Sequence, residues 1–540
     1  QILHVANEDW VVIDLSGKNL GLEGAKKIAN WLQNHPNVRE LNLANTAIGS
    51  EGVIMLAKSL ENHTNLHKLN LGNNNISTRA IKEIAKVVEK QTNLQELCLN
   101  NNRIDDEAVT LLAKALGKHS SLHTLDLSKN LIQANCIEDL FSSLTNHSNF
   151  CVLNLKNNFI GSEGAKALAA KLVNHTKLKI LNLAGNQIDG AGGAALAGSI
   201  GNLRQLQILD LEGNQIGNQR GEEGSCLLAN SLSRLAKLQK LNLCNNQIDD
   251  KVVEELTHAL KDHIGLKVLN LACNQISSEG VTALVQLLDN HCKSTSILKL
   301  RSAPALEILN LSDNQIDSRG AKNLSKALEQ YTKLRELDLG NNNIGDEGAE
   351  AVASLLAYYN SGWVSSPALK TLGLHNNQIG DIGSNKLAKI LQNFKLENLN
   401  LSNNAINAPI IQKISDSFKG NKANLILGNQ SPQIEILPVT YSDGLTEDEI
   451  KEITKCIEEE INKTGACREK VRKLVKETIG LGDPDKEAIL NLITDATILT
   501  KENFDYIAEE IARYTRLRDI GSMNIIKNLI HNQNLISAFR

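Results

Sequence analysis

A phrase of the form Leu-x-x-Leu-x-Leu-x-x-Asn-x-Ile repeats along most of this chain, and it first appears in full from Leu66 to Ile76. Its first position recurs every 28 residues at Leu94, Leu122, Phe150, Leu178 and Leu206. It continues at less regular intervals at Leu238, Leu266, Leu306, Leu334, Leu369 and Leu396, and upstream at Val38 and Trp10. A fixed period of this kind predicts a solenoid, in which each unit buries its apolar face only against its neighbours.

Each unit is expected to contribute a strand, a turn and a helix. In the unit that begins at Leu178, Leu181 and Leu183 alternate and therefore point to the same side of a strand. Asn186 follows, and its side-chain amide both donates and accepts, which suits a turn with unpaired backbone groups. Thr46 and Lys18 replace this Asn in the first two units, as expected for terminal capping repeats.

The helix of a unit is illustrated by residues 163–173, for which Ser162 is the expected N-cap. Apolar residues fall there at i, i+3, i+4 and i+7, namely Ala165, Leu168, Ala169 and Leu172. The small residues Gly164 and Ala165 are expected to let the helix approach the sheet closely. Stacked units therefore predict a parallel sheet inside and a layer of helices outside.

This phrase, with its period of 28 and its Asn-rich turn, resembles the ribonuclease-inhibitor-like class of leucine-rich repeats (LRR). The class includes ribonuclease inhibitor, Ran GTPase-activating protein and the repeat arrays of NOD-like receptors. The resemblance implies an α/β fold, a right-handed horseshoe over residues 1–430 with about 14 repeats. Ribonuclease inhibitor alternates Cys with Asn at the turn and this chain does not, which argues against that activity.

Composition narrows the function further. The net charge of −4 gives no general attraction to nucleic acid or to an anionic membrane. No apolar run approaches the roughly 20 residues that membrane insertion needs. The nine Cys show no Cys-x-x-Cys pairing, which indicates reduced thiols in a cytosolic, reducing environment. Because the chain opens with Gln1, we expect that it is trimmed, and removal of a targeting segment stays open.

Three intervals exceed the period and predict surface loops. They are 32 residues from Leu206 to Leu238, 40 from Leu266 to Leu306, and 35 from Leu334 to Leu369. The last contains Tyr358, Tyr359 and Trp363, although aromatic residues make up only 3% of the chain. Exposed Tyr and Trp anchor protein interfaces, so these three are candidate partner-binding residues. The alternative is that they pack against the neighbouring insertion and seal the edge of the solenoid.

A row of apolar residues is expected on the concave side of the sheet. The position two residues after the first Leu of the phrase should point outward to solvent. The early repeats carry Glu40, Lys68, Glu96 and Thr124 there, and the late ones carry Glu336, Thr371 and Asn398. The middle repeats carry Val152, Ile180, Ile208, Lys240, Val268 and Ile308. An exposed apolar row is a candidate docking surface, and the alternative is the ordinary strand preference of Val and Ile.

The phrase ends near Leu427, and a linker over residues 431–445 contains Pro432, Pro438 and Gly444. Beyond it the pattern becomes helical, because Thr446 and Glu449 form a capping box before an apolar series. Residues 446–540 are therefore expected to form a small all-α domain, a bundle of four or five helices.

We expect no enzyme, no cofactor, no metal and no small-molecule substrate. The sequence contains no Gly-rich phosphate loop, no His pair at metal spacing on one helix and no serine elbow. His35, His63, His119, His147 and His175 recur near helix ends as part of the repeat. Cys456 and Cys467 each begin a Cys-x-Glu triplet, whereas bacterial LRR ubiquitin ligases carry a catalytic Cys-x-Asp in a larger helical domain. A ligase is therefore a remote alternative.

The leading interpretation is a non-enzymatic protein-protein interaction scaffold. An Asn-, Lys- and Ile-rich array with a C-terminal helical module is similar to LRR effectors that intracellular bacteria secrete into host cells, so the partner would be a host protein. The main alternative is a GTPase-activating protein that resembles the Ran-directed LRR family and acts on a small GTPase. That family usually carries a strongly acidic tail, whereas this chain ends in mixed charge and Arg540.

Overall fold

The computed structural model describes residues 3–7, 10–61, 63–217, 222–297, 304–361 and 368–428. These residues lie in one compact unit, Gln1–Gln433. The predicted linker over 431–445, the helical domain over 446–540 and the side chain of Trp363 lie outside the described residues and stay predictions.

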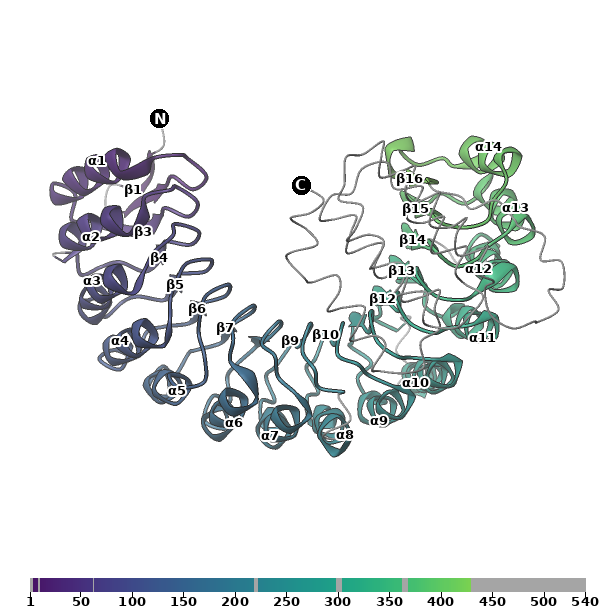
Figure 1. Ribbon diagram of the computed structural model, residues 1–540, viewed down its shortest axis with the longest axis horizontal. Helices are drawn as coiled ribbons and strands as arrows, with labels where there is room; N and C mark the ends of the chain where they lie inside the picture. Colours follow the sequence, from purple (N-terminus) through teal and green to yellow (C-terminus); the bar gives the residue numbers. More distant parts are fainter. Residues whose placement is uncertain are drawn as a thin grey trace, which may run out of the picture. The chain divides into compact units, whose positions relative to one another are not determined.

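The described residues form an open sheet of sixteen strands in the order of the sequence (Figure 1). All neighbouring strands are parallel except the first pair, which is antiparallel. The strands are β1 (Leu3–Asn7), β2 (Trp10–Asp14), β3 (Val38–Asn42), β4 (Lys68–Asn70), β5 (Glu96–Cys98), β6 (Thr124–Asp126), β7 (Val152–Asn154), β8 (Ile180–Asn182), β9 (Ile208–Asp210), β10 (Lys240–Asn242), β11 (Val268–Asn270), β12 (Ile308–Asn310), β13 (Glu336–Asp338), β14 (Thr371–Gly373), β15 (Asn398–Asn400) and β16 (Leu425–Ile426).

One α-helix follows each strand from β2 to β15, so the sheet lies inside the curve of the solenoid and the helices lie outside (Figure 1). The predicted α/β horseshoe is confirmed. The helices are α1 (Gly21–Gln33), α2 (Gly49–Leu60), α3 (Thr78–Lys90), α4 (Asp106–Leu116), α5 (Ile137–Leu144), α6 (Gly161–Leu172), α7 (Gly190–Ile200), α8 (Glu222–Ser231), α9 (Asp250–Leu260), α10 (Ser278–Ile297), α11 (Ser318–Leu328), α12 (Gly345–Tyr359), α13 (Asp381–Leu391) and α14 (Ala408–Ser417).

The hydrophobic core is continuous from one repeat to the next. In the repeat of β8, Leu181 and Leu183 are fully buried, and Leu181 pairs in register with Leu153 on one side and Leu209 on the other. The helix supplies the facing side chains, of which Leu196 and Ile200 are buried in α7. A single repeat has no partner for these groups, so adjacent repeats must fold together.

The Asn of the phrase forms a buried ladder along the turns. The Asn186 amide donates to the carbonyl oxygens of Leu183 at 3.0 Å and of Ala184 at 3.1 Å in its own turn. It also donates to the Leu155 carbonyl of the preceding repeat at 2.9 Å. The same contacts recur at Asn74, Asn102, Asn130, Asn158, Asn214, Asn274, Asn314, Asn342 and Asn404. The predicted role of the Asn as a partner for unpaired turn carbonyls is therefore observed.

The expected cap of the sixth helix is wrong. Helix α6 begins at Gly161, which has a φ of 60°, and no side chain caps it. Ser162 instead donates its hydroxyl to Asp189 of the next repeat. Asp189 is itself the cap of α7, because its carboxylate accepts from the Gly192 amide at 3.0 Å. Side chains at the start of one helix therefore help to cap the next one.

Gly164 stands at a close approach. A Cβ atom at this position would lie 2.5 Å from Cγ2 of Ile160 in its own repeat and 3.1 Å from the Cα of Ala134 in the preceding repeat. The small residue therefore allows close packing within its repeat and between consecutive repeats.

Two insertions lengthen helices. Helix α10 has 20 residues and α12 has 15, whereas α11 between them has 11. Part of the added sequence that we expected to form loops is therefore helical, at the end of each helix that leads to the next strand. None of the described helices is both long enough and apolar enough to cross a membrane.

Candidate functional site

The middle of the concave face carries the predicted apolar row. Register pairs its members across six consecutive strands, from β7 to β12, so each one lies beside the next. We call this set the concave row, and it consists of Val152, Ile180, Ile208, Lys240, Val268 and Ile308. The sequence pattern therefore identified real spatial neighbours, although their binding role stays a prediction.

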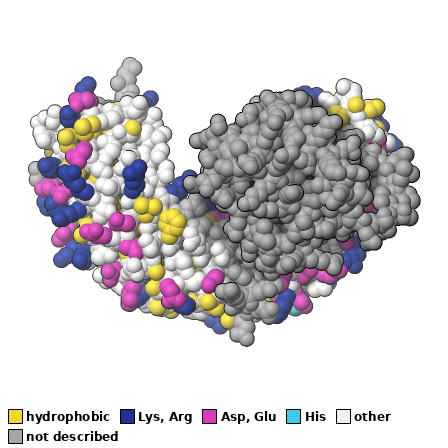
Figure 2. Space-filling view, viewed as in Figure 1, with side chains coloured by type: hydrophobic (Ala, Val, Ile, Leu, Met, Phe, Trp, Pro, Cys, Tyr) yellow, Lys and Arg dark blue, Asp and Glu magenta, His cyan; other side chains and the backbone are white. Residues whose placement is uncertain are grey.

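The concave row is open to solvent in part. Its apolar members are half-buried, whereas Lys240 is exposed in the centre of the row. The next residue of each strand is a core Leu on the opposite face, such as Leu181 beside Ile180. Toward the N-terminus the row continues with charged side chains, including an ion pair of 3.3 Å between Lys68 and Glu96. The face shown in Figure 2 likewise carries hydrophobic side chains in small groups between charged ones.

The next outward row of the sheet is structural. It carries Asn or Asp in most repeats, and the side-chain oxygen accepts from the backbone amide two residues later. Examples are Asn182 with Ala184 at 3.0 Å and Asp210 with Glu212 at 3.1 Å. These side chains already have partners, so they shape the turn at the end of each strand. Their recurrence therefore has a structural explanation within the repeat itself.

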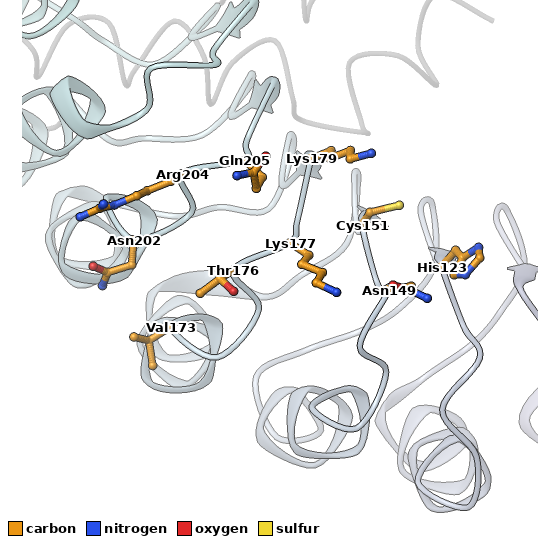
Figure 3. Close-up of a pocket in the computed structure, with 10 residues that line it drawn as sticks. All are labelled: His123, Asn149, Cys151, Val173, Thr176, Lys177, Lys179, Asn202, Arg204 and Gln205. Carbon is orange, nitrogen blue, oxygen red and sulfur yellow. The ribbon is translucent and has the colours of Figure 1, made fainter.

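A groove of about 940 Å³ lies beside the concave row, where helices return to strands (Figure 3). Figure 3 shows that Lys179, Cys151 and His123 follow one another where successive strands begin. The remaining labelled residues come from the loops that follow the helices. They are Asn149, Val173, Thr176, Lys177, Asn202, Arg204 and Gln205.

The groove is basic. Lys177, Lys179 and Arg204 are all exposed, and none of them forms an ion pair with a described residue. No Asp or Glu is among the residues that line the groove. Lys237 lies close by, because its ammonium donates to the Gln205 side chain at 2.6 Å. Sequence reasoning missed this groove, since seven of its ten lining residues come from irregular loops outside the repeated phrase.

Models of the Leucine Rich Repeat match the chain in many places. The chain carries leucine-rich repeats. One model matches residues 34–57, 62–85, 90–113, 148–169, 174–197, 266–285, 303–325, 331–353 and 392–415, and a second matches residues 237–259. The matched segments span the strand, the Asn turn and the start of the helix, which are the parts that repeat in the structure.

Solved structures to which the chain is similar include an internalin from Listeria monocytogenes. It is 23% identical, and the match covers 73% of this chain and 87% of the internalin chain with a TM-score of 0.46. Another is the LRR ectodomain of the plant membrane receptor kinase GASSHO1/SCHENGEN3 from Arabidopsis thaliana, solved in complex with Casparian strip integrity factor 2. It is 18% identical over 75% of this chain and 61% of that one, with a TM-score of 0.29. Among curated proteins, no relative matches the sequence.

The leucine-rich repeats place Tyr359 in the core, so the expectation of an exposed anchor is wrong for this residue. Its side chain is 1% exposed, and its hydroxyl donates to the carbonyl oxygens of Leu328 at 2.8 Å and Tyr331 at 3.1 Å. Tyr358 is half-buried beside it at the end of α12. Trp363 lies outside the described residues. Tyr359 lies 28 residues after Tyr331, and that repeat phase was the available signal for its burial.

Tyr359 belongs to a row of polar side chains at the helix ends of the leucine-rich repeats. Tyr331 donates to the Leu288 carbonyl at 2.9 Å, and His147 bonds the Leu116 carbonyl through Nε2 at 3.0 Å. The other members with such a bond are His63, His175 and His291. The Leu288 carbonyl lies in the middle of α10, and the other helix acceptors lie at or near the end of the preceding helix, where backbone acceptors lack partners. The recurrent His residues that form these bonds thus have a structural role.

Burial lowers the pKa of several His side chains in the repeats. It lowers the pKa of His119 to about 4, with a smaller contribution from His147. Burial also lowers the pKa of His147, His175, His263 and His291. Burial therefore favours the neutral form of these five His residues in the folded array. Within the described part of the chain, no group of three or more His, Cys, Asp or Glu side chains is arranged to hold a metal ion.

Proposed function

We propose that this protein is a non-enzymatic scaffold that binds a protein partner on the concave face of its leucine-rich repeats. The observation that carries the proposal is the concave row, in which five half-buried apolar side chains and the exposed Lys240 line six adjacent strands. Its members do not supply the core, because the Leu residues beside them fill it on the opposite face. Protein interfaces draw most of their affinity from such a partly desolvated centre with a polar surround.

The surround of the concave row matches this description. Lys240 interrupts the row, and Lys179 with its basic groove borders it on one side. A partner segment that fits both features would present apolar side chains flanked by carboxylates. Tyr358 and Trp363, which belong to the long interval between Leu334 and Leu369, would supply a second, smaller contact, as aromatic residues often do at interfaces.

We further propose that the array is of the ribonuclease-inhibitor-like subtype and that the protein is an effector that acts inside a host cell. The period of 28, the Asn turns and the helix in every repeat support the subtype. The free cysteines of the described repeats are compatible with a reducing, cytosolic environment. The partner would then be a host protein.

The test compares two double variants of the full chain. Ile180→Glu with Ile208→Glu places two charges in the concave row, and the expected result is at least a tenfold loss of partner affinity. Leu131→Glu with Phe159→Glu is the matched control, because these side chains are 46% and 49% exposed on adjacent repeats outside the row. The control should bind the partner normally.

The partner is first captured from host lysate by the unchanged chain, identified by mass spectrometry, and then titrated as a purified protein. Circular dichroism and thermal melting establish whether each variant folds. Normal affinity of a folded row variant would rule out the concave row as the docking surface. Unfolding of that variant would instead assign Ile180 and Ile208 to the core.

A catalytic assay distinguishes the proposed scaffold from the alternative, a GTPase-activating protein. Trace amounts of the full chain are added to purified small GTPases loaded with GTP. A scaffold leaves the rate of hydrolysis unchanged, whereas an activator raises it at substoichiometric concentration.

A further inference from the structure

Two cysteines on consecutive turns have no part in the proposed docking surface. Cys244 follows β10, and Cys273 follows β11 in the next repeat. The backbone amide of Asn245 donates to the carbonyl of Ala272 at 2.9 Å. This bond joins the peptide group directly after Cys244 to the peptide group directly before Cys273. The two Cα atoms therefore flank one hydrogen bond, so the two cysteines are direct neighbours on adjacent turns. Disulfides join residues whose Cα atoms lie about 4.4–6.8 Å apart.

The side chains meet as well as the backbones. The thiols of Cys244 and Cys273 interact with each other by a side-chain hydrogen bond. Cys273 is exposed, and Cys244 is half-buried. Both turns are held in place, because the Cys244 carbonyl accepts from Gly213 at 2.8 Å and the Cys273 amide donates to Ser312 at 2.9 Å. A bond between the two sulfur atoms would therefore need little movement of the chain.

We propose that Cys244 and Cys273 form a dithiol site that reacts with small, neutral or cationic disulfides and closes to an inter-repeat disulfide. Cys244 is the attacking thiol and Cys273 is the resolving thiol. This site is independent of the proposed function.

The attacking and resolving roles follow from the hydrogen bond between the two thiols, and the choice of disulfide follows from the charges around them. The hydrogen bond from Cys273 lowers the pKa of Cys244 and raises that of Cys273, so Cys244 is the thiol that ionises. Burial, by contrast, raises the pKa of Cys98 to about 11. Glu212, Asp210 and Asp313 lie close enough to Cys244 to oppose its ionisation. The same carboxylates repel an anionic disulfide such as oxidised glutathione and attract a cationic one such as cystamine.

The reaction balances in two exchange steps. The Cys244 thiolate attacks one sulfur of cystamine, the S–S bond of cystamine breaks, and the leaving cysteamine thiolate takes up the proton that Cys244 released. Cys273 then loses its proton and attacks the Cys244 sulfur, which releases the second cysteamine as a thiol. The protein loses two electrons and two protons, and one cystamine becomes two cysteamines.

The experiment treats the fully reduced full chain with cystamine in the absence of oxygen and maps the products by mass spectrometry. We expect a Cys244–Cys273 disulfide that retains no cysteamine, formed at least about tenfold faster than any adduct on Cys98. Oxidised glutathione should react several-fold more slowly than cystamine, and added salt should narrow that difference.

Three variants assign the roles. Cys273→Ser should retain one cysteamine on residue 244, because no resolving thiol remains. Cys244→Ser should slow the reaction of Cys273 by at least about tenfold. The matched control, Cys98→Ser, should form the Cys244–Cys273 bond at the original rate. Stable cysteamine on Cys244 in the unchanged chain would overturn the proposal, as would equal reaction rates at Cys98 and Cys244.

Discussion

The side-chain amide of Asn186 donates a hydrogen bond of 2.9 Å to the carbonyl oxygen of Leu155, which belongs to the preceding repeat. The Asn186 backbone amide in turn donates to the side chain of Asn214 in the following repeat at 3.0 Å. Each turn is thus held by both of its neighbours. Stability in such an array is shared between adjacent repeats, so a local defect should spread.

Replacement of Asn186 by Ala tests this coupling. The variant leaves buried carbonyls without donors, which should lower the free energy of unfolding by about 1–3 kcal/mol in urea titrations. Asn174→Ala, at an exposed position in the loop after α6, should change it by less than about 0.5 kcal/mol. Equal stability of the two variants would remove the proposed role of the ladder.

Asp317 should stabilise the start of α11 through two contacts. Its carboxylate accepts from the Ser278 hydroxyl of the preceding repeat and from the Gly320 amide at 2.9 Å. Asp317→Ala should cost about 1 kcal/mol, whereas Asp317→Asn should cost less because an amide oxygen still accepts. The hydrogen bonds from Ser278 and Gly320 hold the pKa of Asp317 below its ordinary value. Its contribution is therefore present above about pH 4 and lost as the pH falls further. A loss that is the same at pH 7 and pH 2 would contradict this account.

As the pH falls, the free energy of unfolding of the array should decrease before the carboxylates are protonated. The unfolded chain binds a proton on His119 near pH 6.5, whereas burial lowers the pKa of the folded residue to about 4. Stability is thus complete above pH 6.5 and falls as the pH drops toward 4, by up to about 2 kcal/mol at pH 5 for this residue. His119→Gln, which copies Gln91 of the previous repeat, should reduce the difference between urea midpoints at pH 7 and pH 5. If the two urea midpoints differed as much in this variant as in the unchanged chain, His119 would not be the cause of the acid destabilisation.

Tyr359 and its neighbour Tyr358 should respond differently to the same change. Tyr359→Phe removes a buried hydroxyl that serves two carbonyl oxygens, so we expect a loss of about 1–3 kcal/mol on unfolding. Tyr358→Phe is the control and should have little effect, since its side chain is only half-buried. If Tyr359→Phe kept full stability and lost partner binding, the hydroxyl would have an interface role after all.

The features that sequence predicted best are those that repeat. The Leu positions, the Asn turn and the concave row recur at a constant spacing, and each repeat presents them in register with the last. Local features were predicted less well. Ser162 was assigned as a cap from its place before a helix, yet its hydroxyl reaches Asp189 in another repeat. Strand β1 and its antiparallel pairing with β2 were not predicted, because β1 lies outside the repeated phrase.

One part of the candidate site could be predicted from the sequence and another part could not. The concave row follows from strand alternation, which fixes the side of the sheet on which Ile180 and Ile208 lie. The basic groove needs Lys177 and Arg204 to approach from different loops, and no spacing in the sequence reports that approach. Tyr359 was misassigned because its aromatic side chain was considered and its position within the 28-residue repeat was not.

The bond from the turn asparagine to the preceding repeat keeps its length across the insertions. The amide-to-carbonyl contact is 2.9 Å when 31 residues separate Asn186 from Leu155, and 3.0 Å when 43 residues separate Asn314 from Leu271. The extra residues are absorbed on the outer side, in part by longer helices such as α10. Changes in chain length on the convex layer therefore leave the inner surface undisturbed. The two faces of this protein can vary independently, one in size and the other in the chemistry it presents.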